Sequence, residues 1–323
     1  MTQRLLSLFL ASLLLFVPKL ARATPAAELL SSGRADAAIA ALQQQLNAAP
    51  NNAAAYALLA RTYYVMERWD DAITAARQAV ALEPRTSEYH LWLGRAYGEK
   101  AEQSSWVSAL PLARKTRSEF EKAVELNGSN ADARCDLAEF YISAPSFLGG
   151  SKEKAQAQAD RLHALGNEPP ALWIQSRIAE ADKNFAAAEQ YLRAAISASH
   201  GNPETYLNLA SFYRRQGRMA DMGNSLHQAV QAANQSQQYG SLLEAAQMLN
   251  RTGRNLEEAL RLVRTYVASP QHSEEAPLFQ AYYLMGTIQE KLGDKRAAAG
   301  EYRTALSLAS GFAPAQAALK RIQ

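Results

Sequence analysis

Residues 56–63 read YALLARTY, and the same pattern returns as HLWLGRAY at 90–97 and as YLNLASFY at 206–213. Each copy begins with an aromatic residue or histidine, has a leucine beside a small residue at its centre, and ends with tyrosine. The first two copies start 34 residues apart, at positions 56 and 90. This period indicates repeated helical hairpins, each too small to bury its apolar face alone, so that neighbouring hairpins must stack.

Alanine spacing and proline positions mark the second helix of a hairpin. After the first copy of the pattern the chain continues with Ala72, Ala76 and Ala79, which lie about one helical turn apart, and Pro84 ends the run. Pro50 ends the preceding unit in the same way. The composition is 48% apolar and only 8% aromatic, which suits closely packed helices. We therefore predict an all-α, right-handed superhelical solenoid of about eight hairpins with a C-terminal capping helix.

The predicted solenoid covers residues 24–323 and divides into units of unequal regularity. Regular units are expected at 26–50, 53–84, 203–230 and 279–309, long-tipped units at 87–127 and 131–165, weak units at 169–199 and 239–267, and the polar cap at 314–323. The weak units lack the aromatic pattern, so the pattern does not fix their register.

Two neighbouring units contain extra residues between their helices. In the third unit the extra stretch covers residues 98–113, and in the fourth it covers residues 143–150. Insertions in repeat proteins usually lie in loops on one face, and that face is often functional. The residues singled out in these long hairpin tips are Trp106, Phe147, Gly149 and Gly150.

The first 23 residues differ in kind from the rest. Arg4 precedes an apolar run at residues 5–17, Pro18 breaks the run, and Ala-Arg-Ala at 21–23 resembles a cleavage site. The run is too short for a membrane span, so the segment is typical of a secretory signal peptide. We expect an exported, periplasmic protein with no membrane span after cleavage. The alternative is an uncleaved N-terminal anchor.

Net charge excludes one class of partner. The whole chain has a formal charge of +3, but the predicted signal peptide contains three basic residues and no acidic one. The remaining chain would carry 34 − 3 = 31 basic and 31 acidic residues. Since general nucleic-acid binding requires a surplus of lysine and arginine, we expect none.

Cys135 is the only cysteine, so an internal disulfide is impossible.

Motifs for catalysis are missing from the sequence. It contains no H-E-x-x-H, no phosphate-binding glycine loop and no G-x-S-x-G. The histidines are scattered, at His90, His163, His200, His227 and His272. We therefore expect no enzymatic activity, no metal and no cofactor.

The repeated pattern and its alanine-rich second helices resemble the tetratricopeptide-repeat superfamily over nearly all of residues 24–323. The insertion at 98–113 and the Ala-Pro to Gly-Gly turn at 144–150 are more loosely similar to exported bacterial proteins of the TRAP-transporter-associated type. The superfamily resemblance implies a non-catalytic scaffold whose first helices line a concave groove for a peptide or partner helix.

The same resemblance gives candidate groove residues. If the first helix of each hairpin faces the groove, the residue after the small one points inward, and three of the first four such residues are arginines. Such a row could bind carboxylates, or Glu139 could instead pair with Arg95 or Arg177 and leave a solvated charge row. Apolar inward residues could anchor a partner or serve ordinary packing between repeats. The candidates are Arg61, Arg95, Cys135, Glu139, Trp173, Arg177, Arg214 and Tyr283.

The sequence therefore favours a non-catalytic protein-interaction scaffold of the cell envelope that binds a peptide or partner protein in its groove. The alternative is an accessory or ligand-binding subunit of a TRAP-type solute-uptake system, in which the long tips frame the ligand or dock a binding protein. The oligomeric state stays open at this point.

Overall fold

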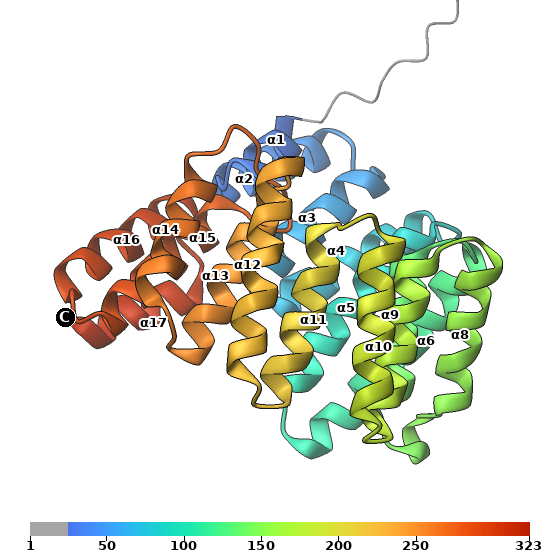
Figure 1. Ribbon diagram of the computed structural model, residues 1–323. Helices are drawn as coiled ribbons and strands as arrows, with labels where there is room; N and C mark the ends of the chain where they lie inside the picture. The colour runs from blue at the N-terminus through green and yellow to red at the C-terminus, as the bar shows by residue number, and fades with distance from the viewer. Residues whose placement is uncertain (1–24) are drawn as a thin grey trace, which may run out of the picture.

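The computed structural model describes residues 25–323, which fold into 17 α-helices and one short 3-10 helix, η1 (Ser146–Leu148). The predicted signal peptide lies outside the described residues. The helices are arranged as eight hairpins and a final helix, which follow one another along the chain (Figure 1). They are α1 (Pro25–Ser31) and α2 (Ala35–Ala48), α3 (Ala53–Val65) and α4 (Trp69–Leu82), α5 (Ser87–Glu102) and α6 (Trp106–Leu126), α7 (Ala131–Ser143) and α8 (Lys152–Ala164), α9 (Glu168–Ala181) and α10 (Phe185–Ala198), α11 (Pro203–Arg215) and α12 (Met219–Ser236), α13 (Gly240–Thr252) and α14 (Leu256–Val267), α15 (Leu278–Lys291) and α16 (Lys295–Leu308), and α17 (Ala313–Ile322).

The small residue of the repeated pattern lies where the two helices of a hairpin meet. A Cβ atom on Gly94 of α5 would lie 2.6 Å from the ring of Phe120 in α6. A Cβ atom on Gly286 of α15 would likewise lie 2.4 Å from the ring of Tyr302 in α16. Both distances are far below van der Waals contact, so glycine at these positions allows the helices to approach each other. All-helical architecture built from hairpins, as predicted, is confirmed.

The extra residues of the third unit lengthen its helices instead of forming a loop. α5 continues to Glu102 and α6 begins at Trp106, so only residues 103–105 connect them. α6 has 21 residues and includes Pro111 near its N-terminal end. The extra stretch at 98–113, which the sequence placed in a lengthened hairpin tip, is therefore mostly helical. Its alanine and leucine residues favour helix, and a proline disturbs a helix least near its N-terminal end.

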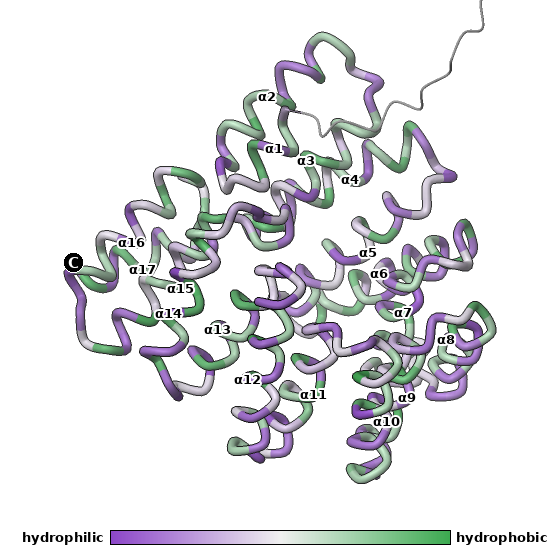
Figure 2. Tube along the Cα trace, turned by 45° about the horizontal axis from the view of Figure 1, so that its top comes forward, coloured by the Kyte–Doolittle hydropathy of each residue, from purple (hydrophilic) through white to green (hydrophobic). Residues whose placement is uncertain are grey.

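The two ends of the solenoid meet. In Figure 2 the hairpins follow a closed circuit, with α1–α4 at the top, α5–α8 on the right, α9–α12 below and α13–α17 on the left. A buried apolar cluster joins Leu30 of α1 and Met66 after α3 to Phe279 of α15 and Phe312 before α17. The rings of Phe279 and Phe312 meet edge to face with centroids 5.1 Å apart. The first and last hairpins are therefore in direct contact, and we call this contact the closing interface.

Polar contacts support the same closing interface. The Gln280 side chain donates a hydrogen bond to the Val65 carbonyl at 2.7 Å, and the Ser310 amide donates to Asp36 at 2.8 Å. Arg61 of α3 forms an ion pair with Glu274 at 2.6 Å.

Within residues 25–323 no helix combines the length and the apolar character needed to cross a membrane.

Candidate functional site

A cavity of about 500 Å³ lies between the two hairpins with lengthened tips, and we call it the inter-hairpin pocket. α5 and α6 form one side, and α7 with η1 forms the other. The residues that matter for its chemistry are Tyr64, Arg95, Glu99, Glu102, Phe120, Asp136, Glu139, Phe140 and Leu148. The first helices α3, α5 and α7 contribute side chains to the pocket, and so does the second helix α6.

An apolar, exposed rim lies beside the inter-hairpin pocket, next to its lining residue Leu148. Trp106 at the start of α6 and Phe147 in η1 meet edge to face, with ring centroids 6.2 Å apart. Their exposed fractions are 65% and 61%, and that of neighbouring Val107 is 77%. Residues 103–113 and 140–151 contain no charged residue, although 20% of the chain is charged. An exposed apolar surface of this kind is typical of an interaction site.

Two glycines shape the tip that carries Phe147. Gly149 has a φ of 98°, a conformation that favours glycine. A Cβ atom on Gly150 would lie only 1.8 Å from the Ala144 carbonyl oxygen, so this tight turn requires glycine. Arg117 of α6 donates a hydrogen bond to the Leu148 carbonyl at 2.7 Å and thereby joins the tip to the neighbouring hairpin.

Charged groups line the inner part of the pocket. Arg95 donates a hydrogen bond to Asp136 at 2.6 Å, and Tyr64 donates one to Glu99 at 3.1 Å. Burial raises the pKa of Glu99, the charge of Glu102 raises it further, and the Tyr64 hydroxyl only partly offsets these effects. Burial also raises the pKa of Asp136, against the opposing effect of Arg95. The pocket therefore holds two carboxylates, those of Glu99 and Asp136, in an environment that disfavours their charge.

We expect Glu99→Gln to raise the melting temperature at pH 7. The raised pKa of Glu99 means that its charged form is less stable in the folded protein than in water, and glutamine removes that charge while still accepting the Tyr64 hydrogen bond. The difference from wild type should shrink as the pH falls through the raised pKa, because wild-type Glu99 is then neutral as well. Thermal melts between pH 4 and pH 8 check this, and a difference that grows toward low pH would contradict it.

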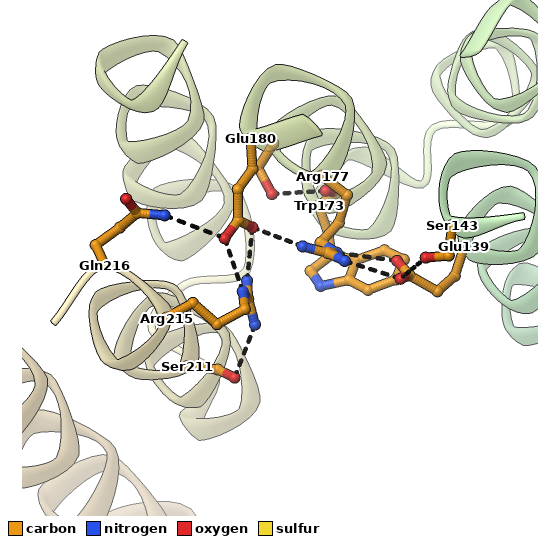
Figure 3. A network of polar contacts seen from close by, with 9 residues as sticks. Glu139, Ser143, Trp173, Arg177, Glu180, Ser211, Arg215 and Gln216 are labelled. Carbon is orange, nitrogen blue, oxygen red and sulfur yellow. Dashed lines mark hydrogen bonds and ion pairs between the residues drawn. The ribbon is translucent and has the colours of Figure 1, made fainter. Parts of the chain in front are cut away.

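The predicted arginine row is already occupied by acidic partners. In Figure 3, Arg177 of α9 lies between Glu139 of α7 and Glu180 of its own helix. Two hydrogen bonds of 2.9 and 2.8 Å join Arg177 to Glu139, and Arg215 of α11 continues the network to Glu180 at 2.8 Å. Although burial opposes it, the Arg177 hydrogen bonds lower the pKa of Glu139. This arginine network links α7, α9 and α11, the first helices of three successive hairpins. Glu139 pairs with Arg177, one of the two partners considered from the sequence.

The remaining predicted groove residues do not gather in one place. Arg61 and Tyr283 lie near the closing interface, where the Tyr283 ring meets that of Phe312 at 5.2 Å. Cys135 and Trp173 contact the buried cluster between α6 and α9, and burial raises the pKa of the Cys135 thiol. Arg214 forms no ion pair within residues 25–323, whereas its neighbour Arg215 belongs to the arginine network. Of the predicted set, only Arg95 and Glu139 line the inter-hairpin pocket.

Sequence reasoning missed several pocket residues. Glu99 lies four residues after Arg95 and therefore on the same face of the helix. Applying this spacing to the predicted inward residue Arg95 would have identified Glu99. Phe140 directly follows the predicted Glu139. Tyr64 lies beside the final tyrosine of the first pattern, in a position that the pattern does not specify. No group of three or more metal-ligating side chains occurs in the described part of the chain.

Comparison with known proteins agrees with the repeat architecture. Residues 29–95 and 279–312 match family models described as tetratricopeptide repeat. The yeast Tom70 structure aligns with a TM-score of 0.52 and 14% identity, covering 93% of this chain and 65% of that chain. No curated protein matches the sequence.

Two bacterial structures are also similar. A tetratricopeptide repeat protein from Parabacteroides merdae has a TM-score of 0.45 and 16% identity, over 92% of this chain and 95% of that chain. A thermophilic protein of the same kind from Thermus thermophilus has a TM-score of 0.48 and 21% identity, over 58% of this chain and 94% of that chain. The family matches and the helical architecture together identify the chain as an all-α solenoid that contains tetratricopeptide repeats.

Proposed function

We propose that this protein is a non-catalytic scaffold of the cell envelope that captures an extended segment of a partner protein in the inter-hairpin pocket. The observation that carries the proposal is the pocket itself, whose volume of about 500 Å³ lies within the range of known ligand sites. Its aromatic walls, which include Phe120 and Phe140, are suited to hold an apolar anchor of the partner.

The repeat type supports a binding role. Tetratricopeptide-repeat proteins generally act as protein-interaction scaffolds, and this chain contains such repeats at both ends. The exposed Trp106 and Phe147 side chains extend the pocket's apolar surface outward, so that a bound segment would contact more than one side chain of the scaffold. The envelope location rests on the sequence of residues 1–23, with its short apolar run and Ala-Arg-Ala ending.

Gly98 offers a sharp test because it lines the pocket and has room for a side chain. A Cβ atom there would meet only Thr116, at an ordinary contact distance of 3.6 Å. Gly98→Leu should therefore fill part of the cavity, and it should stabilise the helix by about 0.5–1 kcal/mol because glycine is a poor helix residue. Gly223→Leu in α12 is the matched control, since that glycine is also helical and has no neighbouring atom within 4 Å of its Cβ position.

The experiment uses the full chain with a C-terminal affinity tag, expressed in its own organism and purified from the envelope fraction with bound proteins quantified by mass spectrometry. We expect Gly98→Leu to recover about one tenth or less of the partner that wild type recovers, which corresponds to 1.4 kcal/mol or more of binding free energy. Gly223→Leu should recover the wild-type amount. Equal recovery with both variants would place the binding site elsewhere.

A second candidate is an accessory or ligand-binding subunit of a TRAP-type solute-uptake system, with the pocket holding a small solute. The cavity volume favours this candidate, because it fits a small molecule as well as a side chain. A small solute would raise the melting temperature of the isolated wild-type protein but not that of Gly98→Leu. The carboxylates that line the pocket disfavour an organic acid as that solute.

A further inference from the structure

The inter-hairpin pocket has more negative than positive groups on its wall. Four carboxylates and one arginine line it, and the arginine, Arg95, is already held by Asp136 at 2.6 Å. Glu139 is held by Arg177 at 2.8 Å, which comes from the neighbouring hairpin. Glu99 and Glu102 form no ion pair within the described residues. Two carboxylates of the lining therefore lack a cationic partner, the half-buried Glu99 and the exposed Glu102.

The nearest basic side chain in sequence does not neutralise this excess. Lys100 follows Glu99 directly, but its ammonium group pairs with Asp70 of α4. A carboxylate ligand entering the pocket would meet the two uncompensated glutamates and an arginine that is already occupied. A cation would instead gain two acceptors, and the rings of Tyr64 and Phe140, which line the pocket, could contact a cation or its apolar stem.

The surroundings of the pocket indicate that the cation is part of a peptide segment. Leu148 lines the cavity, and its neighbour Phe147 packs edge to face against Trp106. The exposed apolar surface of Phe147 and Trp106 would contact residues beside an inserted side chain. A free small amine would fill the cavity and leave this rim uncovered. A segment with apolar residues beside a basic one covers both surfaces.

We propose that the inter-hairpin pocket takes a lysine or arginine side chain of the partner, with its charged end between Glu99 and Glu102 and its stem against the aromatic wall. This inference rests on the proposed function and specifies the partner chemically as a segment in which a basic residue is flanked by apolar ones. Because the environment of Glu99 already disfavours its charge, a bound cation would relieve that cost and gain binding free energy from it.

Three short peptides test the proposal with the full-length protein. Their sequences are Ac-Ala-Leu-Xaa-Leu-Ala-NH₂, in which the central residue is lysine, norleucine or glutamate, so that the stem is kept while the charge changes. Dissociation constants come from NMR titration at pH 7 and low salt. We expect the lysine peptide to bind about tenfold more tightly than the norleucine peptide, as a charge-assisted contact in a half-buried site allows. The glutamate peptide should bind most weakly.

The Glu99→Gln/Glu102→Gln double variant should reduce the ratio between the lysine and norleucine peptides to about one, because neither glutamine is charged. Glu83→Gln/Glu257→Gln is the control, since it removes the same net charge from exposed positions outside the pocket and should preserve the ratio. The proposal is overturned if the lysine peptide has no advantage in wild type, if its advantage survives in the pocket variant, or if it does not bind at millimolar concentration. Partner loss with Gly98→Leu under any of these outcomes would leave the proposed function standing.

Discussion

Replacing Phe312 by alanine is expected to lower the free energy of unfolding of the closing interface by about 3–5 kcal/mol, the usual cost of deleting a buried aromatic side chain. Phe312 is 1% exposed, and its ring contacts those of Phe279 and Tyr283. Its cluster also contains Met66, which is distant in sequence, so the loss falls on the contact between the two ends of the solenoid.

Hydrogen exchange with mass spectrometry gives the most informative readout for Phe312→Ala. Exchange should accelerate in α1–α3 as well as in α15–α17, because both sides of the interface lose the same buried ring. Phe147→Ala is the control, since that side chain is 61% exposed and should change stability by no more than about 0.5 kcal/mol. Faster exchange limited to α15–α17 would mean that the ends do not depend on each other.

Gly94→Leu should destabilise the protein by about 1–3 kcal/mol or more, because the new side chain would enter a fully packed site. Its Cβ atom alone would lie 2.6 Å from Phe120, which is itself buried between hairpins. Gly98→Leu lies one turn later on the same helix and is expected to stabilise it. Urea unfolding of both variants therefore separates the effect of close packing from that of helix propensity. A Gly94→Leu variant as stable as wild type would show that α5 and α6 do not approach as described.

Local features of the sequence were enough to predict the helical hairpins. Gly94 and Ala60 occupy the small position of the pattern. A small residue is needed at Gly94 because the two helices of the hairpin contact each other there. The long tips at Trp106 and Phe147 were also visible as extra residues between regular segments. The repeat pattern did not indicate that helices α5 and α6 extend through most of 98–113, a stretch that mixes helix-favouring alanine, leucine and glutamate with serine, glycine and proline.

Contacts between distant residues were beyond the reach of the repeat pattern. The bond from Gln280 to Val65 joins residues 215 positions apart, and nothing in either repeat predicts the other as its partner. The sequence named Arg214 as a groove candidate, whereas Arg215, the next residue, bonds Glu180. Neighbouring helical residues point about 100° apart, so the two arginines face different surroundings.

The central claim is that a partner segment enters the inter-hairpin pocket, and site-specific photocrosslinking in the native organism tests it most directly. A photoreactive phenylalanine analogue replaces Ala101, which lines the pocket, or Gly300, which lies exposed on α16. We expect a covalent partner adduct from position 101, none from position 300, and loss of the adduct when Gly98→Leu is added. An adduct from position 101 that persists with Gly98→Leu, or one that forms equally at position 300, would contradict the claim.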